Sequence, residues 1–106
     1  MFVKISDQYY NMNNLKYFEF DSSMLSLYFL GTLVSQIQQS IEDYNSFLNF
    51  MNKNRLAFVE NNLGINLKTV TNFNISENDN SFFFIDNSYK NFNVSAKTLE
   101  KFISEE

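Results

Sequence analysis

The sequence predicts an α+β fold made of two similar units in tandem, each a β-meander of four strands followed by one helix (ββββα twice). Two observations predict it. The halves align without a gap at a constant offset of 55 residues, as from Asn11 to Asn66, and apolar positions fall on apolar positions. Each half also ends in a segment whose apolar residues recur every three or four positions, the spacing of a helix. We therefore expect a single domain over residues 1–106, with repeat units at 1–52 and 56–106.

The second half shows the strands of the unit most clearly. Residues 70–76 alternate between apolar and polar side chains, which predicts a strand. Residues 77–80 are a polar turn cluster. Two further strand-like segments, 81–85 and 89–94, flank the short polar loop 86–88, which suits a hairpin. Each unit is therefore expected to be a meander of antiparallel strands.

Each half then ends in a predicted helix with its own N-cap. Ser95 stands where a hydroxyl can accept a free amide of the first helical turn, and apolar residues follow at helical spacing up to Ile103. Ser40 takes the same place in the first half, with Asp43 three residues later completing a capping-box-like pair. Residues 52–55 then form the linker between the units.

A second interpretation of the first half stays open. Apolar residues from 27 to 51 also fall at spacings of three and four without a break, which fits one long heptad-patterned helix over about residues 23–52. Gly31 inside such a helix would cost about 1 kcal/mol relative to Ala. The alternative fold class is therefore α+β with one long helix.

Alternation also places apolar side chains on the sheet face opposite the core, namely Tyr17, Tyr28, Leu30, Phe83 and Ile85. That is more apolar surface than a one-sided sheet leaves in water. We expect the other repeat, a second copy of the chain or a foreign partner to cover it, and these five residues are the candidate protein interface.

The reactive side chains that most catalysis needs are missing. The sequence has no His and no Cys, which excludes Ser-His-Asp and Cys-His nucleophiles and zinc sites built from these residues. Only two glycines are present, so Gly-rich phosphate loops are absent. We predict that the protein is no enzyme and has no catalytic residues, no cofactor and no metal site.

Composition also suggests a compartment and a source. Without Cys there is no disulfide framework, the N-terminus lacks a signal-peptide pattern, and no apolar stretch approaches the roughly 20 residues of a membrane span. These features predict a cytoplasmic protein. Abundant Asn with little Gly, Ala and Arg is typical of A/T-rich coding, as in a low-GC bacterium or a phage or other mobile element.

The net charge of −4 and the scattered basic residues argue against nucleic acid as a partner. One group of residues supports the opposite view. Tyr9 and Tyr10 could form a stacking platform for bases, with Lys4 and Lys16 beside the phosphates.

The function favoured by the sequence is a non-catalytic protein-binding module, regulatory or inhibitory. It would be a phage or mobile-element accessory protein that blocks a larger complex and forms a homodimer through its second sheet face. The alternative is a protein that binds single-stranded nucleic acid, and the third choice is a structural protein that associates with itself.

Overall fold

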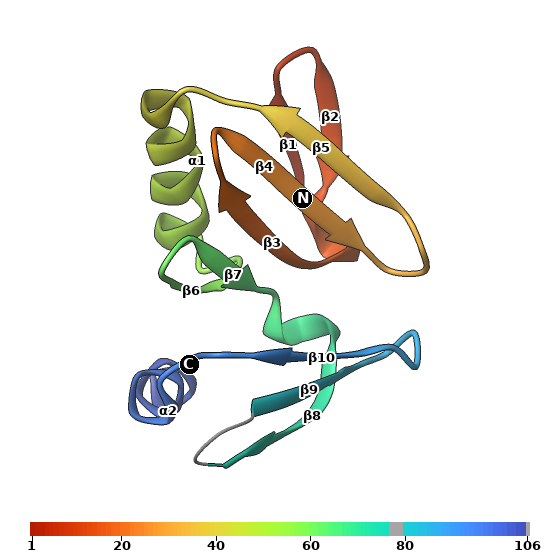
Figure 1. Cartoon of the computed structure of the whole chain (residues 1–106), viewed down its shortest axis with the longest axis vertical. Helices are drawn as coiled ribbons and strands as arrows, with labels where there is room; N and C mark the ends of the chain where they lie inside the picture. Colours follow the sequence, from red (N-terminus) through yellow and green to blue (C-terminus); the bar gives the residue numbers. More distant parts are fainter. Residues whose placement is uncertain (77–79, 106) are drawn as a thin grey trace.

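The computed structural model of the chain describes residues 1–76 and 80–105, and Figure 1 shows the order of the elements. The first half holds β1 (Phe2–Ile5), β2 (Gln8–Asn11), the 3₁₀ turn η1 (Met12–Asn14), β3 (Leu15–Asp21), β4 (Met24–Phe29), β5 (Val34–Gln38) and α1 (Ile41–Lys53). The second half holds β6 (Phe58–Glu60), β7 (Leu63–Ile65), η2 (Leu67–Thr69), β8 (Val70–Ile75), β9 (Asn80–Phe84), β10 (Tyr89–Phe92) and α2 (Ala96–Ser104).

The α+β class is confirmed, but four strands per unit is wrong, because each half contains five strands among the described residues. The sequence pattern missed β2 and β7. The second of these is only three residues long, and both return from the preceding strand through two-residue turns. Asn61 and Asn62 have φ values of 50° and 62°, the left-handed conformation that tight hairpin turns require. The predicted turn at 77–80 lies, apart from Asn80, outside the described residues.

The two halves are not separate bodies, because their strands share a sheet. The described strands form a five-stranded sheet of order β5-β4-β3-β7-β6, a three-stranded sheet of order β10-β9-β8, and the β1–β2 hairpin. The β6–β7 hairpin of the second half pairs with β3 of the first, with Phe18 opposite Gly64. The added Cβ of any larger residue at Gly64 would overlap the Phe18 ring, so this contact requires glycine.

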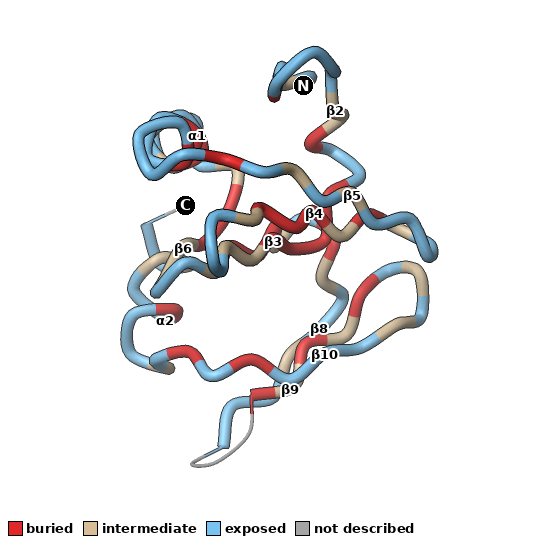
Figure 2. The backbone as a smooth tube through the Cα atoms, turned by 45° about the horizontal axis from the view of Figure 1, so that its top comes forward, coloured by how far each residue is buried: buried red, intermediate tan, exposed pale blue. Residues whose placement is uncertain are grey.

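The five-stranded sheet lies between two apolar cores. One core joins it to α1 and the β1–β2 hairpin, and there Phe18 packs edge-on against Phe47 with ring centroids 5.0 Å apart. The other core joins it to β8–β10 and α2, and there Tyr17 packs edge-on against Phe92 at 4.9 Å. Adjacent residues of β3 thus point into opposite cores, as strand geometry dictates. Figure 2 shows the resulting run of buried positions along β3 and β4.

The long-helix alternative is wrong. Residues 24–29 and 34–38 are the strands β4 and β5, and Gly31 has φ +83° in the turn between them. The helix begins only after Ser40, whose hydroxyl accepts a hydrogen bond from the Asp43 amide at 3.1 Å. Ser95 caps α2 in the same way, accepting from the Thr98 amide at 3.3 Å. Both predicted N-caps are confirmed. No helix in the described ranges is long and apolar enough to cross a membrane.

The second face of the large sheet is covered from within the chain. Tyr17 is only 8% exposed and stacks on Tyr28 at 4.3 Å, beneath the rings of Phe84 and Phe92. The three-stranded sheet of the second half therefore supplies the shielding. Of the three covers expected from the sequence, the structure shows the other half of the chain, and neither a second copy nor a foreign partner is needed for this face. The physical reason given for a homodimer no longer holds.

Candidate functional site

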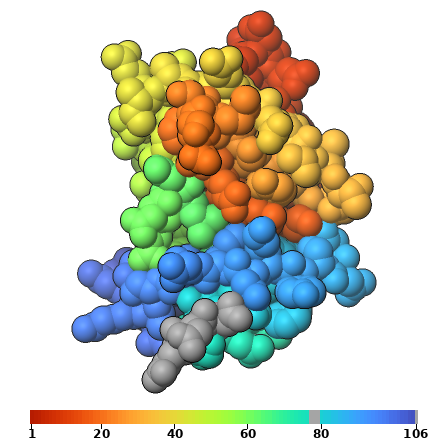
Figure 3. Space-filling view, in the orientation of Figure 1, coloured from red at the N-terminus to blue at the C-terminus, as the bar shows by residue number. Residues whose placement is uncertain are grey.

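Two hairpin loops from different sheets meet at one carboxylate. The β4–β5 loop (residues 30–33) and the β9–β10 loop (residues 85–88) lie on the same side of the molecule (Figures 1 and 3). Asp86 Oδ2 accepts a hydrogen bond from the Gly31 amide at 2.8 Å and from Lys16 Nζ at 3.0 Å. Its Oδ1 accepts from the amide and the hydroxyl of Ser88. Asp86 thus fixes its own loop and holds the neighbouring loop against it.

Lys16 completes this contact from β3. Its Nζ also donates to the Gly31 carbonyl at 3.3 Å and to Ser88 Oγ at 3.1 Å. Lys16 sits at the β-bulge between Leu15 and Tyr17 and is only 8% exposed. The prediction that Lys16 lies beside phosphates is therefore wrong, because its ammonium group is already satisfied inside the protein.

The hydrogen bonds around Asp86 change its acidity. Burial by itself would raise the pKa of this carboxyl group. The donors from Ser88, Gly31 and Lys16 outweigh that effect and hold the pKa well below its usual range. Asp86 is therefore charged at neutral pH, and the loops are joined by an ionic contact.

The other candidates for nucleic-acid contact lie on the β1–β2 hairpin. Lys4 and Tyr9 are cross-strand partners, and Lys4 Nζ lies 5.9 Å from the centre of the Tyr9 ring. Tyr9 is 67% exposed. Tyr10 is half-buried instead, since its ring stacks on Phe29 and its hydroxyl donates to Gln8 Oε1 at 2.8 Å. The structure therefore brings Lys4 and Tyr9 together at the surface and uses Tyr10 for packing.

A groove runs between this hairpin and the β4–β5 loop. It has a volume of about 550 Å³, and its lining includes Gln8, Tyr9, Asn14, Leu30 and Leu33. The name hairpin–loop surface is used below for Lys4, Gln8, Tyr9, Asn14, residues 30–33 and residues 85–88. It combines one cation, an exposed aromatic ring, several amide side chains and backbone held in fixed loops.

The five residues predicted as a protein interface do not form one surface. Tyr17 and Tyr28 pack together inside the second core. Phe83 is half-buried against Tyr89, with ring centroids 5.8 Å apart. Leu30 and Ile85 lie in the two paired loops. Alternation describes Tyr17, Tyr28 and Phe83, which lie in strands, but Leu30 and Ile85 lie beyond the ends of β4 and β9. The packing of one sheet on the other could not be read from alternation.

The sequence did not identify Asp86, Lys16 and Gly31 as the residues that join the two loops. The sequence indicated a hairpin loop at 86–88, and Asp followed two positions later by Ser is the pattern of an Asx-turn. Nothing local to that turn indicates that its carboxylate reaches Lys16 and Gly31. Among the residues that the structure describes, no cluster of three or more His, Cys, Asp or Glu side chains could hold a metal ion.

Comparison with known proteins gives one informative likeness. No protein-family model matches the chain, and no curated protein matches it. Among solved structures, the fold is similar to that of a Bacillus cereus domain described as the LytTr DNA-binding domain of a response regulator, with a TM-score of 0.62. The match covers 98% of this chain and 93% of that one at 12% sequence identity. At this identity the likeness shows a shared fold.

This finding corrects the function favoured by the sequence. The sequence favoured a protein-binding inhibitor from a phage and made nucleic acid an unlikely partner. Both predictions are contradicted, because the domain that shares the fold over nearly its whole length is described as a DNA-binding domain. The net charge of −4 bears on non-specific attraction to phosphates, so it does not by itself exclude a nucleic-acid partner.

Proposed function

We propose that this chain binds DNA and that the hairpin–loop surface contacts it. The observation that carries the proposal is the fold shared with the LytTr DNA-binding domain over 98% of this chain and 93% of that one. A match of that extent includes the loops and hairpins as well as the sheets, so it supports the same general use of the fold.

The chemistry of the surface supports contact with bases more than a general grip on the backbone. Amide side chains such as those of Gln8, Asn14 and Asn87 carry a donor and an acceptor, which suits the base edges exposed in a DNA groove. Lys4 can pair with a phosphate, and Tyr9 can pack on a sugar or base. With a net charge of −4, the chain should bind random DNA weakly and depend on specific contacts.

Single-stranded nucleic acid is a second candidate, favoured by one observation. Tyr9 is exposed beside a lysine, and an exposed ring next to a cation is an effective platform for an unpaired base. We prefer duplex DNA as the ligand, because a single exposed ring can stack few unpaired bases, whereas the two fixed loops form a rigid edge that can contact a duplex.

We also infer that the two halves are copies of one duplicated unit that share a single domain. Equivalent backbone hydrogen bonds support this. The Leu30 amide donates to the Asn14 carbonyl, and 55 positions later the Ile85 amide donates to the Thr69 carbonyl, both at 2.8 Å. The same elements also follow one another in the same order in each half.

The DNA proposal is tested by selection followed by titration. A randomised duplex pool is selected for binding, and an enriched sequence is titrated by fluorescence polarisation. We expect Lys4→Gln to weaken binding and to reduce the slope of log K against log salt by about 1, the effect of one lost phosphate contact. Lys97→Gln is the matched control, because Lys97 is exposed on α2 and lies outside the hairpin–loop surface.

Three results would count against the proposal. Failure to enrich any duplex would remove DNA binding in its preferred form, and the same pool used as single strands then tests the second candidate. An equal loss of affinity in Lys4→Gln and Lys97→Gln would show that the contact surface has been placed wrongly. An unchanged affinity in Tyr9→Ala would remove Tyr9 from the contact surface.

A further inference from the structure

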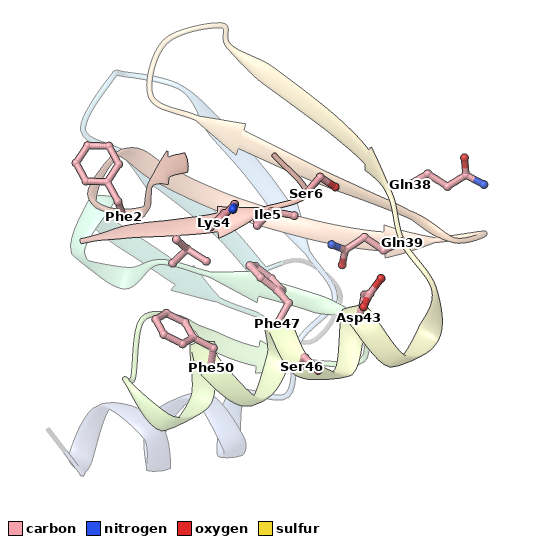
Figure 4. A pocket seen from close by; sticks show the side chains of 11 residues that line it. Phe2, Lys4, Ile5, Ser6, Gln38, Gln39, Asp43, Ser46, Phe47 and Phe50 are labelled. Carbon is pink, nitrogen blue, oxygen red and sulfur yellow. The ribbon is translucent and has the colours of Figure 1, made fainter. Parts of the chain in front are cut away.

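A second groove lies between β1 and α1, away from the paired loops. It has a volume of about 550 Å³, within the range of small-molecule sites. Three aromatic rings, those of Phe2, Phe47 and Phe50, stand along it, and Figure 4 shows them on the strand and the helix that form its walls. Phe2 is 64% exposed and Phe50 37% exposed, so aromatic surface is open to an occupant.

One buried amide in this groove lacks a partner. Gln39 follows β5 and is only 9% exposed, and its Oε1 accepts no hydrogen bond from the part of the chain that the structure describes. Its backbone is fixed, since the Gln39 amide donates to the Ser23 carbonyl at 2.8 Å. Figure 4 shows the side chain extending between β1 and α1. Leaving a buried carbonyl oxygen unpaired costs free energy, so a donor from a ligand would relieve that cost.

The chemistry of the amide indicates the kind of ligand. A Gln side chain offers a donor and an acceptor side by side, the arrangement that pairs with the adjacent donor and acceptor of adenine. A half-turn of the amide exchanges its two atoms, so either can face the groove. Phe2 and Phe50, the two exposed rings of the groove, supply apolar surface on which a planar ring packs. Asp43, exposed at the groove, is an acceptor for a sugar hydroxyl group.

We propose that this groove, the Gln39 groove, binds a purine-type base: a planar heteroaromatic ring with a hydrogen-bond donor next to an acceptor. The base has two possible sources, a free nucleoside or an unpaired base of a nucleic acid strand. The proposal rests on Gln39 and the two exposed rings, Phe2 and Phe50, so it does not depend on DNA binding by the hairpin–loop surface.

The test uses adenosine as the probe, with binding measured by isothermal titration calorimetry on the whole chain. Gln39→Leu keeps the size of the side chain and removes its amide. We expect this variant to bind adenosine at least tenfold more weakly and to melt at the same temperature as the wild type or higher, because it no longer buries an unpaired oxygen. Gln36→Leu is the control, since Gln36 is exposed on β5, the strand that precedes Gln39, and does not line the groove. It should bind like the wild type.

The two sources are separated by repeating the titration with a single-stranded oligo-dA and an oligo-dT. Adenosine binding that is lost in Gln39→Leu supports a free nucleoside. Binding of oligo-dA without binding of free adenosine, again lost in Gln39→Leu, supports a base within a strand. If the wild type binds neither probe, or if Gln39→Leu binds them as well as the wild type does, the proposal is overturned. Strand binding that is insensitive to Gln39→Leu but lost in Tyr9→Ala would overturn this proposal and leave the proposed function intact, because Tyr9 lines the other groove only, whereas Lys4 also lines the Gln39 groove.

Discussion

The Asp86 carboxylate lies 3.0 Å from the Lys16 ammonium group, although the two residues belong to different halves of the chain and are 70 positions apart. The same carboxylate oxygen accepts the Gly31 amide at 2.8 Å. One ion pair with little exposure therefore fixes the relative position of the two loops on which the proposed DNA contact depends.

Replacing Lys16 should test this role of the ion pair. Lys16→Met leaves the Asp86 charge partly buried without its cation, and we expect the free energy of unfolding in urea to fall by about 2 kcal/mol. The double variant Lys16→Met/Asp86→Leu removes both charges and should recover part of that loss. A change below about 0.5 kcal/mol in Lys16→Met would show that the pair contributes as little as an ordinary surface salt bridge.

The lowered pKa of Asp86 predicts a dependence of stability on pH. A carboxyl group whose pKa is lower in the folded state stabilises the protein above its unfolded pKa, near 4, and this contribution is lost as the pH falls below that value. Urea unfolding at pH 7, 5 and 3 should therefore show a smaller loss between pH 5 and 3 in Asp86→Asn than in the wild type. Asp7→Asn, in an exposed turn, is the control. Parallel losses in Asp86→Asn and the wild type would contradict the assignment.

Removing the hydroxyl group of Tyr44 should stabilise the protein. The ring is 1% exposed and stacks on Phe20 at 3.8 Å, but the hydroxyl oxygen has no hydrogen-bond partner among the described residues. We expect Tyr44→Phe to raise the free energy of unfolding by about 1 kcal/mol. Tyr10→Phe is the control, because it removes a hydroxyl that is hydrogen-bonded to Gln8. If Tyr44→Phe is destabilised, Tyr44 has a partner such as a buried water.

Tyr44 also predicts behaviour in alkali. Burial raises the pKa of its phenol to about 12, whereas the unfolded value is about 10. Because the phenol ionises more readily in the unfolded chain, the free energy of unfolding is unaffected by Tyr44 below pH 10 and falls as the pH rises from 10 towards 12. Tyr44→Phe should therefore lose less stability over that interval than the wild type in urea unfolding.

Gly64 should tolerate no side chain, for reasons of space. An added Cβ would overlap the ring of Phe18 across the β3–β7 pair, so Gly64→Ala should lower the free energy of unfolding by about 2 kcal/mol or more. Gly31→Ala meets no atom within 4 Å but has φ +83°, and it should cost about 1 kcal/mol from backbone strain alone. Equal costs in urea unfolding would mean that Phe18 moves aside freely.

Features set by neighbouring residues could be predicted from the sequence. The caps at Ser40 and Ser95 and the strand that begins at Tyr89 depend on short-range patterns, and the structure agrees with them. The strand β7 escaped detection, because three residues centred on Gly64 carry almost no periodic signal. Its pairing with β3 depends on distant residues, which no local pattern can indicate.

The candidate site was predictable only in its separate parts. Lys4 and Tyr9 were singled out together, and their contact follows from the register of one short hairpin. Lys16 was placed beside the phosphates of a nucleic acid bound at Tyr9 and Tyr10. Its true place depends on a bulge in β3 and on an Asp 70 positions later. The site depends on tertiary contacts of this kind.

The most direct test of the central claim is a nuclear magnetic resonance titration of the labelled protein with a selected DNA duplex. We expect the amide resonances of residues 30–33, 85–88 and the β1–β2 hairpin to shift, and those of α2 to stay in place. Shifts confined to α2, or no shifts at saturating duplex, would contradict DNA binding through the hairpin–loop surface.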